Sequence, residues 1–127
     1  MAMTPEGRVK AGIDELLRVL EAYHHKPVQN GMGKPALDYH VCRKGCYAGI
    51  EAKAPGKKPT SRQENTMRKI YRAGGSVFLI DGLKGVDSFQ LAVWLADPSV
   101  QTVSSSAKYI IFGETNAAAR DDRSGNP

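Results

Sequence analysis

The apolar residues of the first segment recur at the three- and four-residue spacing of a helix: Val9, Ile13, Leu16, Leu17 and Leu20. Thr4 is a good N-cap and Pro5 suits the first helical position, so the pattern predicts one amphipathic helix over 5–24. His24 then falls in the last turn, where the helix dipole favours positive charge. Residues 26–35 contain two prolines, two glycines and an asparagine, which predicts a loop.

The spacing changes to that of strands between residues 37 and 53. Lys44-Gly45 is the turn signal in this stretch, because glycine tolerates the positive φ that a two-residue hairpin turn requires. We therefore predict a hairpin with strands over 37–43 and 46–53. In such a hairpin the numbers of facing residues sum to 89, so Asp38 and Glu51 are direct cross-strand neighbours.

A second helix is predicted after the basic loop 54–59. A capping box begins it, formed either by Thr60 with Gln63 or by Ser61 with Glu64. The apolar side chains of its buried stripe are Met67, Ile70 and Tyr71. Two consecutive glycines then end the helix.

Residues 76–81 form a nearly continuous apolar run, which is typical of a strand buried on both faces. A third helix is predicted next, capped by Asp87 or Ser88 and ended by Pro98. The apolar run 108–112 predicts a final strand. The resulting order, α-β-β-α-β-α-β, predicts an α/β or α+β core in which helices flank a mixed central sheet.

The length of 127 residues fits a single domain. We assign this domain to 1–114 and expect a disordered tail over 115–127, where small, polar and charged residues dominate. No apolar run approaches the roughly 20 residues that a membrane helix needs. An intracellular, cytoplasmic protein is therefore expected.

Asp38 and Glu51 repel each other in the predicted register. The Cβ atoms of facing residues are roughly 5 Å apart, and at that spacing two carboxylates repel by roughly 3 kcal/mol at an effective dielectric constant of about 20. A divalent cation would remove this cost. Lys53 projects from the same face as Glu51, because side chains alternate along a strand, so its amine lies beside the acidic pair. The alternative interpretation is a surface hairpin with an ordinary salt bridge.

The sequence resembles the PD-(D/E)XK nucleases, and more closely their VRR-NUC branch. The resemblance is carried by Asp38, by the Glu51-Ala52-Lys53 motif and by Gln63 at a helix start. The resemblance extends to about residue 82 and includes four further segments: Pro5-Glu6, Asn30-Gly31-Met32-Gly33-Lys34-Pro35, Gly56-Lys57 and Ala73-Gly74-Gly75-Ser76-Val77. One position departs from the family pattern. The family usually has proline directly before the acidic residue, whereas Pro35 stands three residues before Asp38.

This resemblance implies a restriction-endonuclease-like core and Mg²⁺-dependent hydrolysis of DNA, with Mn²⁺ as a substitute. The metal ligands that it implies are Asp38, Glu51, the backbone carbonyl of Ala52 and Glu6. It also implies that Lys53 orients or deprotonates the attacking water and that Gln63 lies near the active site. Structural roles stay open for two of these residues, because Gln63 is half of a capping box and Glu6 is an acid favoured at a helix N-terminus.

The resemblance further implies a preferred substrate and an assembly. Small stand-alone members of the branch, many of them from bacteriophages, are associated with homodimers and with cutting branched DNA such as four-way junctions. A dimer would supply two active sites for a two-fold symmetric substrate. If the chain is phage-encoded, the expected location is the host cytoplasm.

The net charge of +5 and the pI of about 9.3 favour a polyanionic partner. Nine Lys or Arg and two carboxylates lie between residues 43 and 72, a local net charge of +7 that leaves −2 for the rest of the chain. The candidate phosphate contacts are Lys57, Lys58, Arg62, Arg68 and Lys69. His40 shares the face of Asp38 and lies opposite Gly49, which leaves space above the strand, so it is a further candidate for contact with DNA or metal. The alternative interpretation is a solvated basic face.

Other functions stay open beside the junction-cutting endonuclease. One is a nuclease of the same fold that acts on duplex, flap or end substrates, and another is a non-catalytic DNA-binding module on a nuclease scaffold. A third is a zinc-stabilised domain that uses His40, Cys42 and Cys46. The register argues against zinc, because Cys42 and Cys46 face opposite sides of the hairpin and no second ligand pair stands at a recognised spacing. Two reduced thiols are expected instead.

Overall fold

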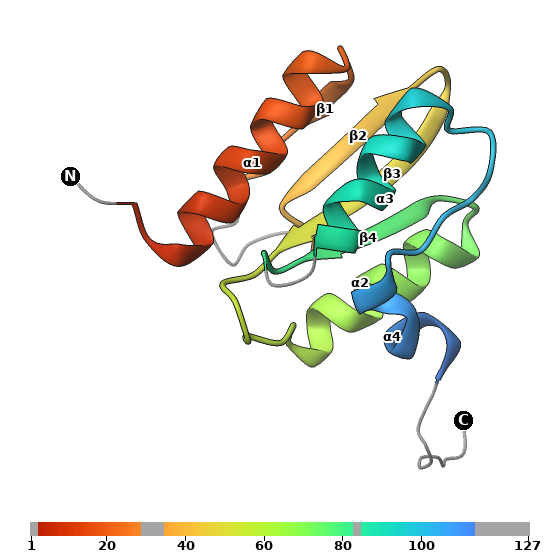
Figure 1. Cartoon of the computed structure of the whole chain (residues 1–127). Coiled ribbons are helices and arrows are strands. Elements are labelled where there is room, and N and C mark those ends of the chain that lie inside the picture. The colour runs from red at the N-terminus through yellow and green to blue at the C-terminus, as the bar shows by residue number, and fades with distance from the viewer. Residues whose placement is uncertain (1–2, 29–34, 83–84, 114–127) are drawn as a thin grey trace.

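The computed structural model describes residues 3–28, 35–82 and 85–113, and these form an α+β fold with a four-stranded mixed sheet flanked by four helices (Figure 1). In chain order the elements are α1 (Pro5–Val19), β1 (Tyr23–His25), β2 (Tyr39–Arg43), β3 (Cys46–Ala52), α2 (Ser61–Arg72), β4 (Ser76–Ile80), α3 (Gly85–Ala96), a 3₁₀ turn (Ser105–Ala107) and α4 (Lys108–Phe112). The predicted tail 115–127 and most of the predicted loop, residues 29–34, lie outside the described residues.

The sheet has the order β1-β2-β3-β4. Its first three strands are antiparallel, and β4 runs parallel to β3 after a crossover through α2. The β2-β3 register is the predicted one, because Tyr39 faces Ile50 and Arg43 faces Cys46. Lys44 and Gly45 both have positive φ, 50° and 80°, as a two-residue hairpin turn with right-handed strand twist requires.

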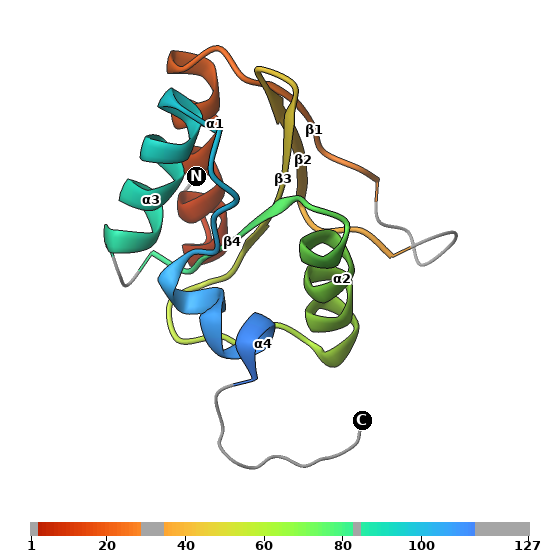
Figure 2. The same cartoon turned by 90° about the vertical axis from the view of Figure 1, so that its right-hand side faces the viewer.

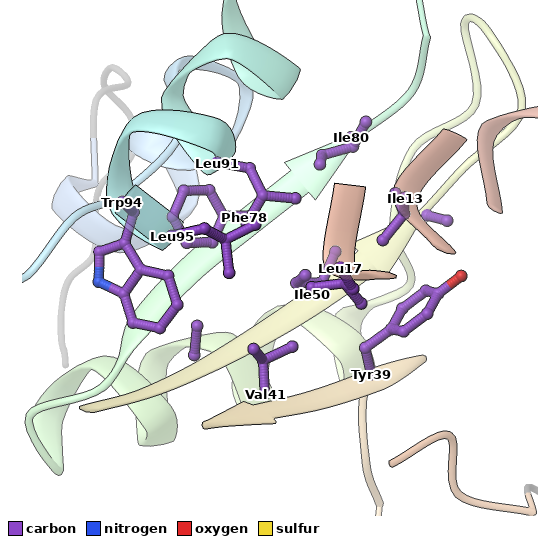
Figure 3. Close-up of a cluster of buried hydrophobic side chains, with 12 residues drawn as sticks. Ile13, Leu17, Tyr39, Val41, Ile50, Phe78, Ile80, Leu91, Trp94 and Leu95 are labelled. Atoms are coloured by element: carbon purple, nitrogen blue, oxygen red, sulfur yellow. The ribbon is translucent and has the colours of Figure 1, made fainter. Parts of the chain in front are cut away.

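Helices cover both faces of the sheet, with α1 and α3 on one side and α2 and α4 on the other (Figure 2). The core beneath α1 and α3 includes Ile13, Leu17, Tyr39, Val41, Ile50, Phe78, Ile80, Leu91, Trp94 and Leu95 (Figure 3). The core beneath α2 and α4 comprises Leu37, Met67, Val77, Leu79, Val103, Ala107 and Ile110. Every residue of β4 is buried, which confirms the prediction of a strand covered on both faces.

The first helix ends at Val19, earlier than predicted, and the chain turns back into β1. Glu21 adopts a left-handed conformation with φ 54°, and the Ala22 amide donates to the Leu17 carbonyl. This is the Schellman ending of a helix, made here without glycine. The prediction of His24 in the last helical turn is therefore wrong, because His24 belongs to β1.

Two predictions at the C-terminal end are also wrong. Residues 108–112 form the short helix α4 instead of a strand. This helix packs on α2, with Ile110 buried in the core between them and Ile111 against it, while Tyr109 and Phe112 are exposed. Asp87 does not cap α3 from outside. It lies within the first turn, fully buried, and its carboxylate accepts hydrogen bonds from the Ser106 amide and hydroxyl. Among the described helices, none combines the length and apolar character that a membrane span needs.

Candidate active site

The structure brings Asp38 and Glu51 into contact at the open end of the hairpin. Asp38 stands directly before β2, and its Oδ2 accepts a 2.9 Å hydrogen bond from the Ala52 amide. The Asp38 amide in turn donates to Glu51 Oε1 at 3.3 Å. Each carboxylate thus accepts a hydrogen bond from a backbone amide of the facing segment, and the two residues lie opposite each other as the register predicts.

Glu51 is buried, with 2% of its surface exposed, although it carries a carboxylate. Burial, together with the adjacent charge of Asp38, raises the pKa of Glu51 to about 8, and the Lys53 amine acts in the opposite direction. A carboxylate with this environment is costly to ionise unless a cation compensates it. A surface hairpin with an ordinary salt bridge would not bury Glu51, so that alternative does not fit.

Lys53 and Gln63 both contact Glu51 Oε2. The Lys53 amine lies 3.7 Å from this oxygen and is itself largely buried. The Gln63 side-chain amide donates to it at 2.9 Å. Gln63 also completes the capping box with Thr60. Its side-chain Oε1 accepts from the Thr60 backbone amide at 2.9 Å, and its backbone amide donates to the Thr60 hydroxyl. The cap fixes the direction of Gln63, and this direction places its amide on the carboxylate.

Lys10 is a member of the site that sequence reasoning missed. Its amine lies 3.2 Å from Glu6 Oε2 and 3.8 Å from Asp38 Oδ1, so α1 contributes a cation as well as an acid. Glu6 and Asp38 thus lie within ion-pairing distance of the same amine. The available signal was the four-residue spacing of Glu6 and Lys10, which places both side chains on one helix face.

His40 does not join the carboxylates. Its ring packs between His25 and Tyr47, with centroid distances of 6.3 and 5.8 Å. The expected space above Gly49 is filled, since a Cβ atom there would lie 2.7 Å from Ile70 Cδ1. The prediction of free space at Gly49 is therefore wrong, and His40 instead contacts the His25 ring and the Tyr47 ring, with its Nδ1 paired to the Tyr47 hydroxyl.

The basic candidates fall into two groups. Lys57, Lys58 and Arg62 are exposed around the start of α2, close in sequence to Gln63, and the Lys58 amine lies over the ring of Tyr109. Arg68 instead binds within the protein: its Nε donates to the Ile110 carbonyl at 3.1 Å, and its guanidinium also contacts Asn65 and Glu64. Lys69, the next residue of α2, is exposed.

The two cysteines are free thiols on different sides of the sheet. Cys46 packs against the core beneath α1 and α3, whereas Cys42 is exposed and faces Tyr47 across the hairpin. Within the described ranges no group of three or more His, Cys, Asp or Glu side chains is placed to hold a metal. Because the two thiols lie on opposite sides of the sheet, Cys42 and Cys46 do not point toward a common zinc position.

The donor atoms of the site match a hard divalent cation. Mg²⁺ takes oxygen ligands and is usually bound through one or two carboxylates, with water and substrate phosphate filling the other positions. Asp38 and Glu51 supply two carboxylates whose mutual repulsion a cation would relieve. No model of a known protein family and no curated protein matches the chain in sequence. The interpretation of the site therefore depends on its own residues.

Proposed function

We propose that this protein is a Mg²⁺-dependent DNA endonuclease with a restriction-endonuclease-like core of the VRR-NUC type. The observation that carries the proposal is the contact set of one buried carboxylate. Glu51 meets Asp38, Lys53 and Gln63 within hydrogen-bonding or ion-pairing distance. These four residues are the ones that the sequence motif names, and they come from the adjoining ends of β2 and β3 and from α2.

The cation would be held by Asp38, Glu51 and the backbone carbonyl of Ala52, with Glu6 nearby on α1. The Ala52 amide already ties this backbone segment to Asp38. A bound Mg²⁺ ion would neutralise phosphate charge and make a water molecule a better nucleophile. Burial around Glu51 strengthens every electrostatic interaction at this point, because water screens it less.

The side chains of the site have distinct roles in this proposal. Lys53 places a positive charge beside Glu51, where it positions the attacking water and stabilises the charge that develops on the phosphate. Gln63 is a positioning residue that fixes the Glu51 carboxylate. Lys10 balances the charge of Asp38 from the other side.

DNA would approach over the start of α2. The exposed Lys57, Lys58 and Arg62 can neutralise phosphates there, next to the helix N-terminus. Arg68 is not part of this surface, because its guanidinium is bound to α4 and to neighbours on α2. The preference for branched DNA and the homodimer follow from the family resemblance and belong to the proposal.

A cleavage assay tests the proposed function. End-labelled four-way junction, flap and linear duplex are incubated with the purified protein in Mg²⁺, in Mn²⁺ and in EDTA. We expect cleavage in the presence of either metal, with the junction cut fastest and no product in EDTA. Equal cutting of all three substrates would favour the general nuclease of the same fold. Binding without cleavage of any substrate in either metal would overturn the proposal in favour of a DNA-binding module.

A further inference from the structure

Three aromatic rings form a row on the sheet face that also carries Asp38 and Glu51. His25 of β1 faces His40 of β2, and the Tyr47 ring of β3 lies beside His40. The Tyr47 hydroxyl and His40 Nδ1 are hydrogen-bonded, so the rings hold one another in place. We call these three residues the aromatic row. Helix α2 covers β3 and β4 on this face, while His25 is exposed and Tyr47 keeps 38% of its surface accessible.

A hollow of about 720 Å³ adjoins the aromatic row. His40 and Tyr47 line it from the sheet, Thr66 and Lys69 line it from α2, and Ala73 lines it from the C-cap of that helix. Its volume falls within the range of small-ligand sites. No carboxylate is among its described lining residues, and Lys69 adds a positive charge. The hollow therefore suits a flat, partly apolar group attached to an anion.

The hollow lies close to the carboxylates, at a distance that one or two nucleotides of a DNA strand can span. This holds along both β2 and α2. His40 is two residues after Asp38 on the same face, which corresponds to roughly 7 Å along a strand. Lys69 is six residues after Gln63 on α2, which corresponds to roughly 9 Å along a helix. A DNA strand held at Asp38 and Glu51 therefore reaches the aromatic row with a neighbouring nucleotide.

We propose that the aromatic row and the hollow bind an unpaired nucleobase of the strand that the carboxylates engage. Every base has a flat face that stacks on an aromatic ring, so such a surface accepts any sequence. A base inside a duplex is already stacked and paired, and cannot enter. The inference rests on the proposed function, because it explains how the proposed nuclease would distinguish branched DNA from a continuous duplex.

The environment of the central ring supports stacking. The His40 ring lies between the rings of His25 and Tyr47, and the hydrogen bond between its Nδ1 and the Tyr47 hydroxyl fixes its orientation. Lys69 provides the charge that a nucleotide phosphate needs at the rim of the hollow. The site thus combines aromatic rings with a basic edge, the arrangement found in binding sites for single-stranded DNA.

The test measures binding in EDTA, where metal-dependent cleavage cannot occur. The probes are a splayed fork with an unpaired 2-aminopurine beside the branch and a matched duplex in which the same base is paired. We expect tighter binding of the fork, with quenching of its 2-aminopurine fluorescence. Tyr47→Leu removes one ring and should weaken fork binding about tenfold with little change for the duplex. Tyr47→Phe keeps the ring and should bind like wild type.

Two further variants make the result decisive. Phe89→Ala removes an exposed ring on α3, on the opposite side of the sheet, and should bind the fork as wild type does. His25→Ala changes an exposed ring of the row and gives the same test if Tyr47→Leu melts at a much lower temperature. Equal affinity of wild type for fork and duplex, or unchanged fork binding in the ring-removing variants, would overturn the inference. Selective fork binding without any cleavage in Mg²⁺ would instead retain the aromatic row and reject the nuclease.

Discussion

At the scale of single residues, the site depends on how one carboxylate is buried. Glu51 has 2% of its surface exposed, yet Asp38 lies against it, and Lys53 brings a positive charge to its Oε2. The residues of this cluster could be predicted from the sequence, because the hairpin turn sets the register that joins positions 38 and 51. Lys10 could not be predicted in the same way, since its contact with Asp38 depends on how α1 packs on the sheet.

The pKa of Glu51 predicts a pH dependence of stability. The folded-state pKa is raised from 4.5 to about 8, so this group stabilises the fold fully below pH 4.5 and loses that contribution as the pH rises through about 8. Wild type should lose up to about 1 kcal/mol of unfolding free energy per pH unit in this window relative to Glu51→Gln. Urea denaturation of both proteins in EDTA from pH 5 to 9 measures the difference. A constant difference across the range would contradict the raised pKa.

Gln63 has two contacts that two substitutions separate. Gln63→Ala removes the capping box and the Glu51 contact, and should lower the unfolding free energy by about 1 kcal/mol. Gln63→Glu retains a capping residue but places a third carboxylate beside Glu51 and Asp38, so its stability should recover when Mg²⁺ is added. Thermal denaturation with and without Mg²⁺ reads both effects. If Mg²⁺ changes the melting temperature of both variants by the same amount as that of wild type, Gln63 acts only as a helix cap.

At the scale of elements, the hairpin and α2 follow from local signals, whereas the C-terminal segment does not. Lys44-Gly45 sets the β2-β3 turn, and Thr60 with Gln63 starts α2, because both signals act within a few residues. The apolar pattern of the short segment 108–112 fits a strand and a helix equally well. The segment forms a helix because it packs against α2. Strand β1 has three residues, too few for a recognisable alternation.

Asp87 shows how a tertiary contact replaces a local cap. The buried carboxylate holds the 3₁₀ turn through the Ser106 amide and hydroxyl, so Asp87→Ala leaves a donor unpaired inside the protein. We expect a loss of about 2 kcal/mol in unfolding free energy, measured by urea denaturation. Asp97→Ala, which removes an exposed carboxylate, should change it by less than about 0.5 kcal/mol. Equal effects of the two substitutions would contradict the structural role of Asp87.

Arg68 and the two lysines of the basic loop should separate stability from DNA affinity. Arg68→Ala removes the bond from α2 to the Ile110 carbonyl and should cost about 1 kcal/mol of stability. Lys57→Ala with Lys58→Ala should leave stability unchanged and reduce the salt dependence of DNA binding by a slope of up to about 2. Melting curves and DNA titrations at several salt concentrations provide both readouts. The reverse pattern would place Arg68 on the DNA surface.

At the scale of the whole molecule, part of the basic charge lies at the end of the sheet that holds the carboxylates. Lys53, Lys57 and Lys58 follow Glu51 at that end of the hairpin, whereas Arg43 and Lys44 lie at its turn. The segment 43–72 carries a local net charge of +7, and it contains β3, the basic loop and α2. Both α1 and α2 present side chains to the carboxylate pair, from opposite faces of the sheet (Figure 2). The sequence indicates the basic segment directly, but the approach of α1 to the site requires the packed core.

The central claim is that Lys53 and the carboxylate pair carry out metal-dependent cleavage, and a matched pair of lysine substitutions tests it. Single-turnover cleavage of the four-way junction in Mg²⁺ is measured for wild type, Lys53→Met and Lys57→Met, at protein concentrations that saturate binding. Lys53 contacts Glu51, whereas Lys57 is exposed four residues further along the chain. We expect Lys53→Met to lower the rate about a hundredfold and Lys57→Met to leave it within a few-fold of wild type. Equal rates for the two variants, or no cleavage by wild type, would contradict the claim.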